Sequence, residues 1–201
     1  RAGQIYEESM AAAQKAAKEN NWSLLSDTSW PGYFKPSFRL MEGYTALMHE
    51  ADAQMPTPTH IFLQAGIGGF PASFAAFARK FYGNGPKIVV VEPTEAPVIQ
   101  ASIAAGKAVE VQGEVSIMGR LDCKVPSLAA LSSLAQTANY CITITDQESK
   151  DCLKELADKG LSTSESGGAG YAALKKAIKN NDCELSSDSK IMLILTEKQT
   201  D

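Results

Sequence analysis

Apolar residues along the chain form short continuous runs that alternate with longer segments of helical periodicity. Buried strands are expected over residues 22–25, 60–64, 87–92, 108–111, 140–145 and 190–195. Helices are expected over residues 3–20, 37–52, 71–82, 95–105, 126–138 and 147–159, and from the glycine-rich stretch 165–170 to about residue 180. Runs such as KIVVVE at 87–92 are typical of parallel strands covered on both faces. The alternation predicts an α/β fold with a doubly wound, mostly parallel sheet and helices on both faces.

Turn and capping residues set the expected ends of several helices. The pair Asn20-Asn21 ends the first helix, and Met55-Pro56-Thr57-Pro58 breaks the second. Asp146 is expected to be the N-cap of the helix 147–159, because an aspartate side chain can accept hydrogen bonds from first-turn amides.

The composition narrows the class of protein. The 201 residues are enough for one α/β domain, 1–201, and 44% hydrophobic with 21% charged residues is ordinary for a soluble globular protein. A net charge of −4 without any basic run excludes a nucleic-acid surface, and no apolar run is long enough to span a membrane. Four cysteines without a C-x-x-C pair, and two histidines distant from them, argue against a metal site and favour reduced thiols in a cytoplasmic protein.

A glycine-rich turn follows the expected strand 60–64. Gly66, Gly68 and Gly69 precede Pro71, which suits the first position of a helix. Glycines allow a sharp turn that presents several N–H groups to one point, and the helix N-terminus adds partial positive charge. This pattern favours a phosphate cradle over a plain strand–helix turn.

Two kinds of phosphate ligand remain open at this point. The Walker pattern fails, because no Gly-Lys-Ser/Thr follows. A dinucleotide of the NAD type is a degraded match: Gly66 and Gly68 fit, Pro71 replaces the last glycine, and Glu92 stands where a ribose-binding acid is expected.

Five blocks in order make the chain resemble a known family. SDTSWPGY, THIFLQAGIGGF, IVVVEP, SIMGRLDCKVPS and SESGGAGYAAL are similar to successive blocks of the diaminopropionate ammonia-lyases, which belong to the tryptophan-synthase-β-like, fold type II enzymes that use pyridoxal 5′-phosphate (PLP). The order and spacing agree across most of residues 5–197. Five ordered blocks are far more specific than the glycine pattern alone.

The resemblance implies roles for six residues. Gly66, Ile67, Gly68 and Gly69 would hold the PLP phosphate through backbone N–H groups. Thr196 would lie near the pyridine nitrogen, where a neutral hydroxyl does not enforce protonation, or would simply end a strand. Asp27 would be the catalytic acid/base at the substrate, although from the residues alone an aspartate before a Pro/Gly loop more often caps a turn.

The chain also departs from the family pattern. The cofactor lysine of such enzymes lies in an amino-terminal block of the form Ser-x-x-x-x-x-Ala-x-Lys-Ala, and no such block occurs here. The first residue is Arg1 and not a methionine. Near the end of the chain, the family's usual T-E-G is replaced by Thr196-Glu197-Lys198. Arg120 stands where smaller residues are common in the family. We therefore expect an incomplete domain: part of the PLP-binding large domain, with a portion of the small domain missing.

The resemblance implies an α,β-elimination that converts 2,3-diaminopropionate, a small amino-acid substrate, to pyruvate and ammonia. It also allows a homodimer for the intact enzyme. The chain by itself is expected to be inactive. The alternatives are a catalytically dead PLP- or phosphate-binding or interaction domain and an NAD-type binding domain.

Overall fold

The computed structural model describes residues 2–3 and 6–198. The chain runs through the helices and strands α1 (Tyr6–Asn20), α2 (Lys35–Asp52), β1 (His60–Gln64), α3 (Gly69–Tyr82), β2 (Lys87–Pro93), α4 (Val98–Ala105), α5 (Leu128–Thr137), β3 (Tyr140–Ile144), α6 (Asp146–Asp158), α7 (Ala169–Asn180) and β4 (Ile191–Leu193). The strands form one sheet in the order β3-β2-β1-β4, and all three pairings are parallel.

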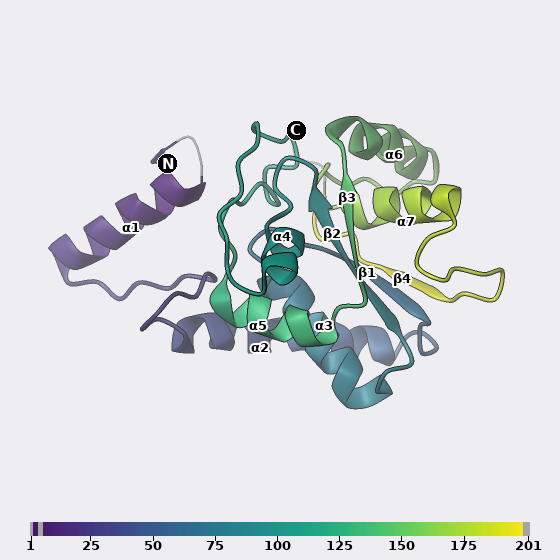
Figure 1. Ribbon diagram of the computed structural model, residues 1–201, viewed down its shortest axis with the longest axis horizontal. Coiled ribbons are helices and arrows are strands. Elements are labelled where there is room, and N and C mark those ends of the chain that lie inside the picture. The colour runs from purple at the N-terminus through teal and green to yellow at the C-terminus, as the bar shows by residue number, and fades with distance from the viewer. Residues whose placement is uncertain (1, 4–5, 199–201) are drawn as a thin grey trace.

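The sheet is covered by helices on both faces, as the apolar runs predict. Figure 1 shows α6 and α7 on one side of the sheet and α3, α4 and α5 on the other. Successive residues of each strand point to opposite faces: Ile61 and Leu63 pack in the core with α3 and α5, whereas Phe62 packs in the core with α7. The central residues of these buried strands are therefore apolar whichever face they point to, and the polar residues stand at or near the strand ends.

The strand order reverses beside β1. From β1 the chain moves outward through α3 to β2 and through α4 and α5 to β3, and then α6 and α7 carry it back to β4 on the other side of β1. Right-handed crossovers in opposite directions place their helices on opposite faces. The segments that follow β1 and β4 consequently separate at the carboxyl edge of the sheet and leave a crevice, which is where ligands of open α/β sheets bind.

Two predicted strands do not form. Residues 22–25 lie in an extended loop in which Trp22 and Leu25 are mostly exposed. Residues 108–111 belong to a long connection in which Val111 donates one backbone hydrogen bond to Lys124. Neither segment belongs to the sheet of the described residues, because apolar composition alone does not make a strand.

The predicted N-cap of α6 is also wrong by one residue. Thr145 accepts a hydrogen bond from the Glu148 amide (3.2 Å), and the Glu148 carboxylate accepts one from the Thr145 amide (2.7 Å). This reciprocal capping box satisfies two amides together. Asp146 instead accepts hydrogen bonds from the Ser116 hydroxyl (2.6 Å) and the Ile117 amide (3.1 Å), and so attaches the long connection to α6.

Glu92, near the end of β2, caps the neighbouring helix α4. Its two carboxylate oxygens accept hydrogen bonds from the amides of Ile99 (2.6 Å) and Gln100 (2.9 Å). The side chain is fully buried, and burial raises the pKa of this carboxyl to about 7 although the amide bonds act in the opposite direction. Glu92 therefore supplies a cap that Pro97, at the N-cap position, cannot provide.

This burial predicts a pH-dependent stability. The folded-state pKa of Glu92, about 7, lies above the ordinary value of 4.5. The Glu92 contribution to the free energy of unfolding is thus largest below pH 4.5 and decreases as the pH rises to 7, by an amount on the order of 3 kcal/mol. Urea unfolding at several pH values in this window measures it.

The control is Glu92→Gln, which carries no charge at any pH in the window. As the pH rises from 4.5 to 7, the free energy of unfolding of the parent chain should decrease relative to that of Glu92→Gln. Parallel pH dependences of the two chains would show that Glu92 keeps an ordinary pKa in the folded state.

Candidate functional site at the sheet edge

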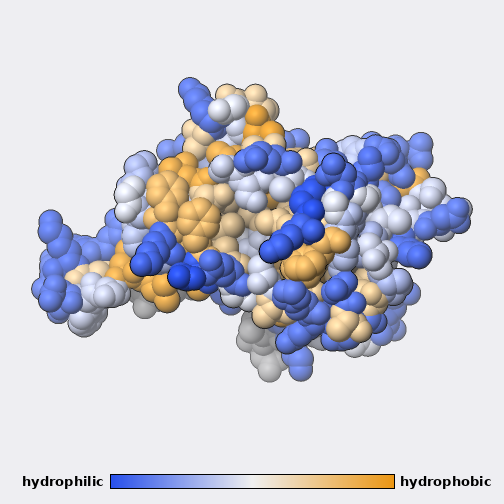
Figure 2. All heavy atoms as spheres, turned by 90° about the horizontal axis from the view of Figure 1, so that it is seen from below, coloured by the Kyte–Doolittle hydropathy of each residue, from blue (hydrophilic) through white to orange (hydrophobic). Residues whose placement is uncertain are grey.

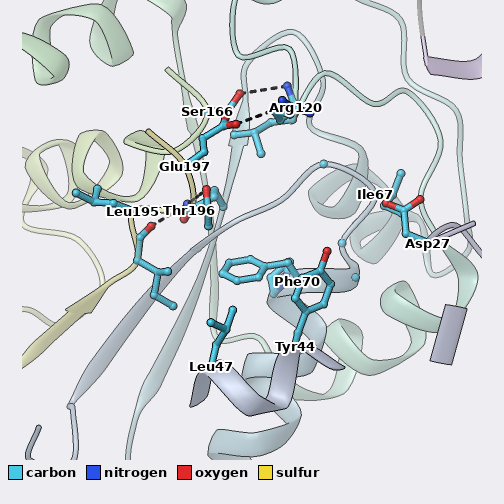
Figure 3. A pocket seen from close by; sticks show the side chains of 17 residues that line it. Asp27, Tyr44, Leu47, Ile67, Phe70, Arg120, Ser166, Leu195, Thr196 and Glu197 are labelled. Atoms are coloured by element: carbon cyan, nitrogen blue, oxygen red, sulfur yellow. Dashed lines mark hydrogen bonds and ion pairs between the residues drawn. The ribbon is translucent and has the colours of Figure 1, made fainter. Parts of the chain in front are cut away.

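A cavity of about 520 Å³ lies at the carboxyl edge of β1 and β4. All six residues singled out in the sequence line it: Asp27, Gly66, Ile67, Gly68, Gly69 and Thr196. They come from three segments far apart in the chain. Figure 3 shows Asp27 and Ile67 on one side of the cavity, with Thr196, Glu197 and Arg120 on the other and Tyr44 and Phe70 below.

The glycine-rich turn presents free amides at the start of α3. Gly68 is the N-cap and has a left-handed φ of 98°, and the helix begins at Gly69. Within the described residues, the amides of Gly66, Gly68 and Gly69 donate to no acceptor. The Ile67 amide differs, because it is directed at the thiol of Cys123, where it opposes the burial that raises that thiol's pKa to about 12. Three of the four predicted amides therefore remain for a ligand.

Packing behind the turn requires glycine at two of these positions. A Cβ on Gly66 would lie 2.8 Å from the Arg120 carbonyl oxygen, and one on Gly68 would lie 2.9 Å from Ile99 Cδ1. At Gly69 the nearest atom to a Cβ would be Met41 Cγ at 3.8 Å, so a side chain fits there. The turn is thus held against the core from behind while its front lines the cavity.

These features fit an anionic group. Three unbonded amides at the first turn of a 14-residue helix concentrate partial positive charge at one point. Within the described residues, no carboxylate accepts a hydrogen bond from the amides of this turn. A phosphate group is the kind of ligand that such a cradle binds.

Gln64, which the sequence analysis did not single out, organises the opposite wall. It is the last residue of β1, and its side-chain Nε2 donates to the carbonyl oxygens of Ile194 (2.9 Å) and Gly167 (3.2 Å) and to Thr196 Oγ1 (3.2 Å). Its Oε1 is buried without a partner among the described residues. The signal in the sequence that could have identified Gln64 is a polar residue that directly follows the apolar run 61–63 of a buried strand.

Arg120, one of the departures from the family pattern, forms an ion pair with Glu197 at the rim of the cavity. Arg120 Nε lies 3.2 Å from Glu197 Oε2, and the other Glu197 oxygen accepts a hydrogen bond from the Ser164 hydroxyl (2.5 Å). The Arg120 amide donates to Ser166 Oγ (3.1 Å). Because the Arg120 side chain is 74% exposed, this ion pair contributes little to stability and instead forms part of the rim.

Asp27 does not cap the turn in which it lies. The Thr28 amide is bonded to Ser26 Oγ (3.1 Å), so Ser26 performs that task. The Asp27 carboxylate accepts one hydrogen bond, from the Tyr6 hydroxyl (2.9 Å), and its second oxygen accepts none within the described residues. Burial, together with the charge of Asp27, raises the pKa of both Tyr6 and Tyr44. An exposed carboxylate with a free oxygen at the cavity can accept a proton from a ligand.

The alternative of an NAD-type site is not supported. It required Glu92 to accept hydrogen bonds from a ribose, but both Glu92 oxygens are bonded to α4 amides and the side chain is 1% exposed. Glu92 is absent from the lining of the cavity.

Three further observations concern the described residues. No lysine among them lines the cavity. No three of their histidine, cysteine, aspartate and glutamate side chains gather in a way that could hold a metal ion. None of their helices has the length and apolar character needed to cross a membrane. The face of the molecule in Figure 2 carries hydrophilic and hydrophobic residues side by side.

Comparisons with known proteins agree with this architecture. The family described as "Pyridoxal-phosphate dependent enzyme" matches residues 1–197. A diaminopropionate ammonia-lyase of Salmonella typhimurium is 30% identical over 97% of this chain and 54% of its own length, and that of Escherichia coli K12 is 28% identical over 98% and 54%. The chain thus spans about half the length of these relatives. The crystal structure of the E. coli lyase with an aminoacrylate-PLP azomethine intermediate superposes with a TM-score of 0.89 at 26% identity, over 98% of this chain and 54% of that one.

The two classes of glycine at the turn predict different mutational outcomes. Gly68→Ala should lower the free energy of unfolding by about 1–3 kcal/mol, because the new Cβ meets Ile99 and the left-handed φ disfavours alanine. Gly69→Ala, the matched control, should change it by less than about 0.5 kcal/mol. Chemical unfolding followed by circular dichroism measures both. Equal effects would mean that the turn is not held against α4 and α5 as described.

Proposed function

The chain belongs to the pyridoxal-phosphate dependent enzyme family, and from this premise we propose that the cavity binds PLP and serves the elimination of ammonia from 2,3-diaminopropionate, with pyruvate as the other product. The observation that carries the proposal is that six residues from three distant segments line one cavity. They include an anion-binding turn, a hydroxyl and a free carboxylate.

Each group of residues has a task in this proposal. The amides of Gly66, Gly68 and Gly69 and the N-terminus of α3 hold the phosphate. Thr196 lies across the cavity and would be the residue that contacts the ring nitrogen. When bound, PLP supplies the electron sink that stabilises negative charge at the substrate Cα and so permits the β-amino group to leave.

Asp27 transfers protons at the substrate. Its carboxylate lines the cavity, and one of its oxygens accepts no hydrogen bond within the described residues. The Tyr6 hydroxyl, which donates to the other oxygen, holds the carboxylate in place and stays protonated because its pKa is raised by burial. This arrangement leaves the second oxygen for the substrate.

A second candidate function is binding of PLP or a phosphate ligand without turnover. The observation that favours it is that no lysine among the described residues lines the cavity, whereas PLP enzymes hold the cofactor through a lysine. The two candidates share the phosphate site and differ in the chemistry at Asp27.

The phosphate site is tested by removing one amide. Gly69→Pro deletes an N–H at the first helical position, where proline is well tolerated, and Gly69→Ala keeps the N–H and is the control. A lost hydrogen bond to a charged group predicts about tenfold weaker binding of PLP by Gly69→Pro, measured by titration of the purified chain. Equal affinities of the two variants would place the phosphate elsewhere.

The catalytic role of Asp27 is tested by isotope exchange. The chain supplied with PLP should accelerate exchange of the Cα hydrogen of 2,3-diaminopropionate with deuterated water, measured by NMR. Asp27→Asn should slow this exchange by about 10²-fold or more, because the amide cannot accept the proton.

Asp158→Asn, the same change at an exposed position of α6, is the control and should leave the rate unchanged. PLP affinity should be equal in all three chains. If the parent chain exchanges no faster than PLP in buffer while still binding it, binding without turnover is the better description.

A further inference from the structure

The side chain of Gln64 joins three segments at one wall of the cavity. It is 3% exposed, and its Nε2 contacts Gly167 before α7, Ile194 after β4, and the Thr196 hydroxyl. No other side chain among the described residues forms a hydrogen bond with Thr196. Within the described residues, Gln64 is therefore the group that determines how this hydroxyl is oriented.

The orientation of the Gln64 amide group is fixed by its surroundings. The oxygens of Gly167 and Ile194 are backbone carbonyls, which only accept hydrogen bonds, so the NH₂ of Gln64 has to face them. The reversed amide would set its oxygen against both carbonyl oxygens. The same NH₂ lies 3.2 Å from Thr196 Oγ1, so its two hydrogens serve three acceptors.

The hydrogen of the Thr196 hydroxyl is consequently left for another partner. A hydroxyl has one donor hydrogen, and the lone pair directed at Gln64 is already used. Thr196 is exposed and lines the cavity, so the hydrogen is available to a ligand there. A donor at this point favours a partner that accepts, and a pyridine nitrogen accepts only in its unprotonated form.

We propose that Gln64 is a positioning residue that holds Thr196 as a hydrogen-bond donor, and that through Thr196 it keeps the ring nitrogen of the bound cofactor unprotonated. The inference rests on the proposed function, because it needs PLP in this cavity. It deepens that function by assigning the protonation of the ring to a residue outside direct contact with it. The end of β1 thereby acts on the ring, while the turn that directly follows β1 holds the phosphate.

The test uses pyridoxamine 5′-phosphate labelled with ¹⁵N in the ring, a ligand that binds without a lysine. The ¹⁵N chemical shift of the bound ligand, followed over a pH titration, reports whether the ring nitrogen is protonated. In the parent chain the nitrogen should be harder to protonate than in the free ligand, by about tenfold in the equilibrium constant. Gln64→Met, which keeps the length but donates no hydrogen bond, should remove this difference, because the Thr196 hydroxyl can then turn.

Variants of Thr196 distinguish a role of Gln64 in orienting the Thr196 hydroxyl from a role in stabilising the fold alone. Thr196→Val should have the same effect as Gln64→Met, Thr196→Ser should behave as the parent chain, and the double variant should equal Thr196→Val. A Gln64→Met chain that changes only stability or affinity, without any change at the ring nitrogen, would overturn the inference. So would additive effects in the double variant.

Other outcomes are also decisive. If Gln64→Met does not fold, the Thr196→Val variant decides. An unchanged protonation equilibrium of the ring nitrogen in Thr196→Val overturns the inference, because Gln64 would then have no hydroxyl to orient. A changed protonation equilibrium supports it. Binding of the ligand by the parent chain with an ordinary ring nitrogen defeats the inference but leaves the cofactor site intact. Failure of the parent chain to bind defeats the proposed cofactor site itself.

Discussion

The reversal of strand order beside β1 is the constraint on which the rest of the structure depends. Because β2 and β4 lie on opposite sides of β1 and all strands are parallel, the segments after β1 and β4 leave the sheet at the same edge but in different directions. The glycine-rich turn and Thr196 thus come to lie across one cavity although they are about 130 residues apart. Asp27 reaches this cavity from outside the sheet.

Polar residues at the ends of buried strands connect the sheet to what surrounds the cavity. Gln64 is the last residue of β1, and Glu92 lies near the end of β2, one residue beyond Val91, the partner of Gln64 in the sheet; both are almost completely buried. Glu92 satisfies the amides of α4, while Gln64 satisfies carbonyl groups of two loops. Opposite backbone groups thus call for a carboxylate in one place and an amide in the other, and this difference separates a structural cap from a residue of the site.

Local pattern predicted those parts of the molecule that local forces determine. The apolar runs at 60–64 and 87–92 became β1 and β2, and the glycine turn before α3 was recognised from its own residues. Residues 22–25 and 108–111 failed as strands because a strand needs a neighbour, which composition does not reveal. Asp27 and Thr196 required the family resemblance, and the Arg120–Glu197 pair could not be foreseen, because it joins side chains 77 positions apart through the fold alone.

The rear surface of the glycine turn has an evolutionary consequence. A Cβ on Gly66 would meet a carbonyl oxygen and one on Gly68 the apolar core around Ile99, so both glycines stabilise the fold whether or not any ligand is present. Purifying selection for a stable core would therefore preserve Gly66 and Gly68 even in a lineage that had lost the enzymatic activity. Gly69 has no such constraint and is free to drift once anion binding is no longer selected. Among descendants of such proteins, replacement at this third glycine would mark the loss of the ligand earlier than any change at the other two.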